Sequence, residues 1–221
     1  MSASAFEYSA AVDGLPRWQH VALIAASAAR LQPVYDLLSD ADEQARYANV
    51  LDTLWRASEE DGDLDAAHSL VLALWPEEED EMDVLTPYHW KIATLRLLKI
   101  SLESAVTEGA ESGARWALDL EIEITSEYEG GIYFAEVPAA APPGLEAEVA
   151  PFEEYARENI RKTLGALASA TGRAQGIQRV RGVSSDAAHV LKTRLVPPWI
   201  QSNGWSPEDL DSARGAAQMG R

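Results

Sequence analysis

The chain has 221 residues, of which 47% are hydrophobic, and it has no cysteine. This is enough apolar material for one domain with a real core, and it excludes disulfides, thiolate nucleophiles and cysteine-based zinc sites. The formal net charge of −18 repels phosphate backbones and therefore disfavours binding to nucleic acid.

The negative charge is concentrated in the first two thirds of the chain. Residues 1–150 hold 8 basic and 29 acidic side chains, a balance of −21, whereas residues 151–221 hold 10 and 7, a balance of +3. An acidic surface attracts a basic partner, but acidity also serves solubility alone, and the sequence leaves both interpretations open. With the first basic residue at Arg17 and no apolar run near the ~20 residues of a membrane span, we expect no secretory signal, no membrane span and a cytoplasmic location.

The first strong element is predicted over residues 17–31, where alanine and larger apolar residues recur at helical spacing. Pro16 suits a helix start, whereas Pro33 should kink or end the helix. The residues before it are small, polar and aromatic, and they predict a loosely ordered lead-in.

Four more helices are predicted in the acidic part of the chain. The first of them begins at a capping box of Asp40 and Glu43 and has the cleanest amphipathic pattern. In the last of them Trp116 is expected to point inward, and Gly130-Gly131 to end the helix. Their expected positions are about residues 40–60, 63–75, 86–108 and 111–128.

Helical signals weaken toward the C-terminus. A helix is expected from Pro151 to Gly172, followed by short helices on either side of a break at residues 182–185. Pro197-Pro198 predicts an extended stretch, and Ser206-Pro207 predicts the start of a last short helix.

These elements predict an all-α fold, because no strand pattern or repeat competes with them. We expect a single-domain helical bundle of about seven to eight helices with a long Pro/Ala-rich loop near residues 130–144. The expected organisation is a lead-in over 1–14, an all-helical domain over 15–196, and an extended segment with a short C-terminal helix over 197–221.

Two stretches carry a family resemblance. The first is Trp18-Gln19-His20-Val21 followed by Arg30-Leu31, Pro33 and Tyr35, and the second is Leu51-Asp52 with Leu54-Trp55; residues 122–127 and 179–182 fit more loosely. In these residues the chain resembles the YjaG-like bacterial family of unknown function (domain of unknown function number 416), over about residues 15–185. The resemblance implies a compact all-helical cytoplasmic protein, and it implies no catalytic residue because the family has no established activity.

The sequence has no spacing typical of a catalytic or metal site. Its four histidines lack the pairing of a metal-binding helix, and no phosphate-binding glycine loop or nucleophile elbow is present. We therefore predict no catalytic residue, no metal and no cofactor. His20, beside Trp18, is the histidine that an interhelical pocket would use, although a histidine in such a place is more often structural.

Two acidic features are candidate partner-binding sites. Asp119, Glu123 and Glu127 recur every four residues and should form one acidic ridge on a helix. The second feature is an acidic loop with Glu77, Glu78, Glu79, Asp80, Glu81 and Asp83. An ordinary solvated surface would explain both equally simply.

Three hypotheses for function follow. The first is a non-catalytic acidic helical protein that docks or neutralises a basic protein partner, as an immunity protein or antitoxin covers the cationic cleft of a toxin. The second is an enzyme or small-molecule binder with an interhelical pocket lined by Trp18 and His20. The third is a homo-oligomer of unknown role, such as a homodimer, joined through the alanine-rich helix.

Overall fold

The computed structural model describes residues 8–76, 86–134 (backbone alone for 128–134) and 152–215. Over these ranges the chain is helical and contains no strand, which confirms the predicted all-α bundle. The helices are α1 (Ser9–Val12), α2 (Arg17–Leu37), α3 (Ala41–Glu60), α4 (Asp65–Leu72), α5 (Pro87–Thr107), α6 (Ala110–Phe134), α7 (Phe152–Ala168), α8 (Arg173–Val190), the π-helical segment η1 (Leu191–Leu195), α9 (Val196–Ser202) and α10 (Pro207–Gly215). None of these helices is long and apolar enough to cross a membrane.

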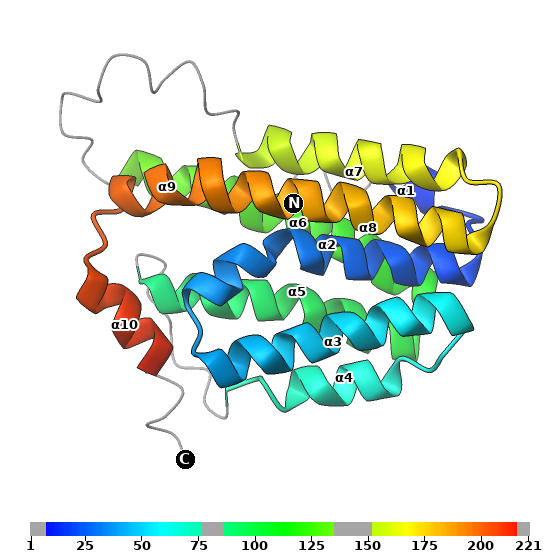
Figure 1. Ribbon diagram of the computed structural model, residues 1–221, viewed down its shortest axis with the longest axis horizontal. Coiled ribbons are helices and arrows are strands. Elements are labelled where there is room, and N and C mark those ends of the chain that lie inside the picture. Colours follow the sequence, from blue (N-terminus) through cyan, green and yellow to red (C-terminus); the bar gives the residue numbers. More distant parts are fainter. Residues whose placement is uncertain (1–7, 77–85, 135–151, 216–221) are drawn as a thin grey trace.

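Helix α2 is the centre of the molecule. It packs against α3, α5, α6 and α8, and Figure 1 shows these long helices running side by side. Nearly every residue from His20 to Leu31 is buried, because this helix is apolar on all sides and must be covered all round. Of the two outcomes expected at Pro33, a kink or an end of the helix, the end does not occur, since α2 continues to Leu37.

Helix α3 forms as its sequence predicts. The side chain of Asp40 accepts a hydrogen bond from the Glu43 N–H at 2.9 Å, and the Glu43 side chain accepts one from the Asp40 N–H at 3.1 Å. This reciprocal cap satisfies two backbone donors that a helix start leaves unpaired. The five apolar residues of the predicted stripe are all buried, namely Tyr47, Val50, Leu51, Leu54 and Trp55.

Helix α6 differs from its prediction in two ways. It passes through Gly130-Gly131 to Phe134, because a glycine costs only about 1 kcal/mol in a helix and need not end one. Trp116 points outward rather than inward and is 45% exposed. Helix α6 lies close against α5 at Gly113. A Cβ atom on this glycine would lie 2.4 Å from the Ser101 carbonyl oxygen.

The C-terminal part is more continuous than expected. Helix α8 runs through the predicted break at residues 182–185, and the predicted extended stretch at Pro197-Pro198 is the first turn of α9. In η1 the Val196 N–H bonds to the Leu191 carbonyl, five residues back. In this wider π turn the usual four-residue backbone hydrogen bonds of an α-helix are already absent. The two prolines, which have no N–H group to donate, therefore cost little stability there.

Candidate functional site

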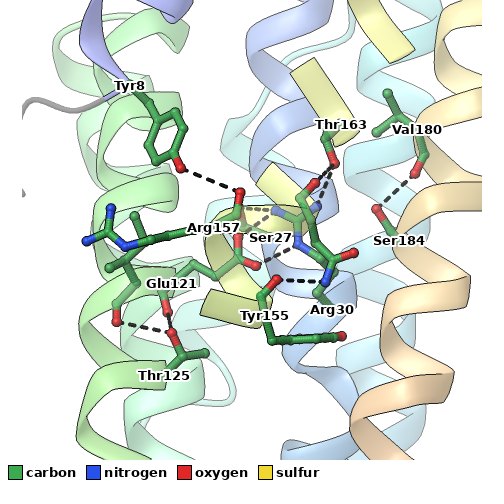
Figure 2. A network of polar contacts seen from close by, with 12 residues as sticks. Tyr8, Ser27, Arg30, Glu121, Thr125, Tyr155, Arg157, Thr163, Val180 and Ser184 are labelled. Atoms are coloured by element: carbon green, nitrogen blue, oxygen red, sulfur yellow. Dashed lines mark hydrogen bonds and ion pairs between the residues drawn. The ribbon is translucent and has the colours of Figure 1, made fainter. Parts of the chain in front are cut away.

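A buried ion pair lies at the centre of the bundle. Arg30 on α2 and Glu121 on α6 have side chains 0% and 1% exposed. The guanidinium donates from Nε to Oε1 at 2.6 Å and from Nη2 to Oε2 at 2.5 Å, so both carboxylate oxygens are engaged (Figure 2). Such a two-pronged pair fixes geometry as well as supplying energy.

Neighbouring hydroxyls complete the hydrogen bonding of Arg30. Its Nη1 donates to Thr163 Oγ1 on α7 at 2.9 Å, and its Nη2 donates to Ser27 Oγ at 3.2 Å. Tyr155, also on α7, donates its hydroxyl to the Ala187 carbonyl of α8. Burial raises the pKa of Tyr155, as does the charge of Glu121, while Arg30 opposes them. The network therefore ties α2, α6 and α7 together with its charges paired.

This ion pair also fixes how α6 is rotated. Glu121 points inward to α2, and a residue two positions further along a helix points about 200° away. Glu123 must therefore face solvent, and it is exposed. Trp116, Asp119 and Glu127 lie on the same side of the helix by this spacing. We call these four residues the α6 ridge.

Among the described residues, few cationic side chains lie beside the carboxylates of the α6 ridge. Glu127 lies 3.9 Å from the Nε2 atom of His89, but Asp119 and Glu123 form no ion pair with any described residue. Partial burial and, to a smaller extent, the negative charge of Glu123 together raise the pKa of Asp119 to about 6. Asp119 is therefore ionised at neutral pH in a place that disfavours its charge.

Cations elsewhere on the molecule are largely used within the fold. Arg173 and Arg181 of α8 bind Asp61 and Glu59 at the end of α3, and the arginines of α7 bind carboxylates of their own helix. The remaining described pairs are Lys91–Glu43, Arg115–Asp13, Arg115–Glu111, Lys162–Glu158 and Arg214–Asp211.

The second predicted acidic feature cannot be placed. Glu77, Glu78, Glu79, Asp80, Glu81 and Asp83 lie outside the described residues. The α6 ridge is therefore the predicted partner-binding feature whose geometry the structure gives, and the acidic loop stays a prediction.

Trp18 and His20 point to different neighbours. His20 is buried, and its Nε2 lies 3.0 Å from the Val12 carbonyl of α1, which can only accept a hydrogen bond. Trp18 packs against Gly176 of α8, where a Cβ atom would come within 2.7 Å of its ring. Each residue thus has a packing partner of its own, and the pocket between them stays a prediction. Within the described ranges, no group of three or more His, Asp and Glu side chains is arranged to hold a metal ion.

Sequence reasoning missed the Arg30–Glu121 pair. A signal was present, because α2 is apolar on every side around Arg30. A charged residue in a helix that must be covered all round has to be buried, and a buried charge needs a partner. The identity of that partner, 91 positions away, has no local signature.

Comparison with known proteins adds no relative. No family model, no curated protein and no solved structure matches the chain. The resemblance to the YjaG-like family therefore rests on the quoted residues alone and stays a prediction.

Proposed function

We propose that this protein is a non-catalytic acidic helical binding protein that docks a basic protein partner on the α6 ridge. The observation that carries the proposal is Asp119, a carboxylate held ionised at neutral pH although burial and Glu123 both disfavour its charge. A charged group that lowers the stability of the fold and forms no ion pair with the described residues is typical of a site kept for function. A cation from a partner would lower the pKa of Asp119 and remove that cost.

Trp116 gives the ridge an anchor of the kind that protein interfaces use. It is 45% exposed, and it precedes Asp119 by three positions on the same side of α6. Tryptophan is enriched among residues that dominate binding energy, and its ring face attracts Lys and Arg. A basic surface could therefore place one cation over Trp116 and others against the carboxylates.

The mode of action that we propose is that of an immunity protein or antitoxin. Such a protein needs no reactive group of its own, since it acts by covering the cationic cleft of its partner. The excess of acidic side chains in residues 1–150 supports a positively charged partner. We propose the cytoplasm as the place of the interaction. A homodimer through α2 is disfavoured, because that helix is covered by its own neighbours.

The test is capture of partners from the native host by the full chain and by two charge-matched variants. Asp119→Asn with Glu123→Gln removes two charges from the ridge, and Asp52→Asn with Asp186→Asn removes two exposed charges from α3 and α8. We expect a basic protein to bind the native chain and the control variant at low salt, and to be lost with the ridge variant and at high salt. Equal binding by both variants would disprove the ridge as the site, and capture of no basic protein would disprove the function.

A further inference from the structure

The turn between α9 and α10 contains the chain's one Asn-Gly sequence, Asn203-Gly204. Gly204 has a φ of +66°, in the left-handed region that glycine adopts without strain. Its N–H donates a hydrogen bond to the Gln201 carbonyl at 3.2 Å. The Trp205 N–H donates to the Ile200 carbonyl at 3.3 Å, which completes a Schellman motif at the end of α9.

The side chain of Asn203 is bound within this turn. Its Nδ2 donates to the Trp199 carbonyl at 2.8 Å. In an Asn-Gly sequence the glycine nitrogen can attack the asparagine Cγ atom, because glycine has no side chain to hinder the approach. Here both reacting groups are engaged elsewhere, the amide with Trp199 and the Gly204 N–H with Gln201. The attack therefore requires the turn to open.

Helix α10, which follows the turn, is attached to the bundle through little buried surface. Ala213 is its buried residue, and Figure 1 shows the helix at the edge of the molecule. Arg214 adds a hydrogen bond from Nε to the Leu37 carbonyl, in the last turn of α2, at 2.9 Å. Segments that bury little apolar surface open at a lower free energy than the core does. We therefore expect α10 and the turn before it to open while the bundle stays folded.

We propose that Asn203 is a site of spontaneous deamidation, which takes place when α10 opens. The Gly204 nitrogen then forms a bond to Cγ of Asn203, the Cγ–Nδ2 bond breaks, and ammonia leaves with the proton of the attacking nitrogen. The product is a succinimide ring. Water opens this ring at either of its two carbonyl–nitrogen bonds, so that position 203 becomes aspartate or isoaspartate.

The reaction would loosen the attachment of α10. A carboxylate only accepts hydrogen bonds, so the product loses the bond from Nδ2 to the Trp199 carbonyl. The new negative charge also lies at the C-terminal end of α9, where the helix dipole disfavours it. Deamidation therefore makes the opening of α10 more frequent, and refolding does not reverse it. This site is separate from the α6 ridge, and neither proposal depends on the other.

Incubation of the full chain in mildly alkaline buffer, followed by peptide mapping and mass spectrometry, tests the site. We expect Asn203 to be converted, with formation of isoaspartate. The other two asparagines are internal controls, because Asn49 and Asn159 lie within helices and precede the branched residues Val50 and Ile160. An Asn203 that stays intact, or that converts no faster than the controls, would overturn the proposal.

A pair of arginine variants tests the role of α10. Arg214→Gln removes the bond to Leu37 and should speed the conversion of Asn203 about 5–10-fold, because α10 is open more often. Arg46→Gln removes the same charge from the exposed face of α3 and should leave the rate unchanged. Equal rates in the two variants would show that opening of α10 does not control the reaction.

The variant Asn203→Asp tests the consequence of the reaction. Amide hydrogen exchange in residues 207–215 should be about 5-fold faster than in the native chain, because the turn has lost a hydrogen bond. Exchange in α7 should stay unchanged, which shows that the bundle remains folded. Unaltered exchange in residues 207–215 would reject the predicted release of α10.

Discussion

At the scale of single residues, two charged side chains differ in whether the fold supplies them with partners. Arg30 is fully buried and is satisfied by Glu121, Ser27 and Thr163. Asp119 is only partly buried and has no described cation beside it. The first charge therefore belongs to the fold, whereas the second works against it, and removing each should change stability in opposite directions.

The variant Asp119→Asn should be more stable than the native chain at pH 7. The folded state raises the pKa of this carboxyl to about 6, above its unfolded value, so ionisation favours the unfolded chain. This cost is complete above about pH 6 and vanishes as the pH falls through 3.8. We expect a gain of roughly 1 kcal/mol, reduced by solvent screening because the group is partly exposed.

Urea unfolding of Asp119→Asn at pH 7 and near pH 4 measures this gain and its loss. Asp52→Asn, an exposed carboxylate on α3, is the matched control and should change stability by less than about 0.5 kcal/mol. A gain that is the same at both pH values would mean that the carboxyl is not the cause.

Breaking the central ion pair should be costly, and replacing both members should not be. Arg30→Met or Glu121→Leu leaves one buried charge without its partner, and we expect a loss of about 3–5 kcal/mol. The double replacement Arg30→Met, Glu121→Leu leaves no charge and should cost much less than the sum of the single changes. Guanidinium unfolding of the three variants supplies the comparison; additive losses would contradict the coupling that the structure indicates.

At the scale of elements, helices α5 and α6 approach each other closely at Gly113. An added Cβ on Gly113 would lie 2.4 Å from the Ser101 carbonyl oxygen and 2.5 Å from Ala105 Cβ. Backbone and a methyl group cannot move aside as a flexible side chain could. The two helices can therefore approach this closely only with glycine at this position.

We expect Gly113→Ala to destabilise the protein by about 1–3 kcal/mol, since it forces α5 and α6 apart. Gly182→Ala is the control, because this glycine lies within α8 with nothing inside 4 Å of an added Cβ. That change should stabilise by about 1 kcal/mol through helix propensity alone. Thermal unfolding followed by circular dichroism compares them, and a stabilised Gly113→Ala would show that the close contact is not real.

Elements with local signals were predicted well, and elements decided by packing were not. The Asp40–Glu43 cap and the stripe of α3 depend on residues a few positions apart, so the sequence contains them completely. Gly130 and Gly131 are predicted to end α6, but the helix runs through them because a glycine costs little there. The stretch at Pro197-Pro198 is predicted to be extended, but it is helical and follows the π turn of η1. Trp116 is predicted to point inward, whereas its outward position follows from the inward Glu121.

The sequence predicted one part of the candidate site and not the other. The four-residue spacing of Asp119, Glu123 and Glu127 predicts a ridge on any helix. What the spacing could not give is the raised pKa of Asp119, because that depends on how α6 sits among its neighbours. It also could not give the solvent exposure of Trp116, which completes the surface.

At the scale of the whole molecule, the net charge of −18 should limit stability. Like charges on a compact body repel one another more than on an expanded chain. Added salt screens this repulsion, and at neutral pH it should raise the melting temperature by about 2–4 °C for each kcal/mol gained. Differential scanning calorimetry at low and high sodium chloride measures the shift. Near pH 4.5, where the net charge approaches zero, the gain should disappear, and its persistence there would point to a cause other than repulsion.

The central place of α2 has a consequence for how the chain reaches its fold during synthesis. This helix leaves the ribosome first among the long helices, yet its Arg30 finds Glu121 and Thr163 only after 91 and 133 more residues, and Trp18 meets Gly176 later still. Until then its apolar surface has no complete cover. We expect nascent chains that stop before α8 to be bound by chaperones or degraded, and the full-length chain to be released from them in one cooperative step.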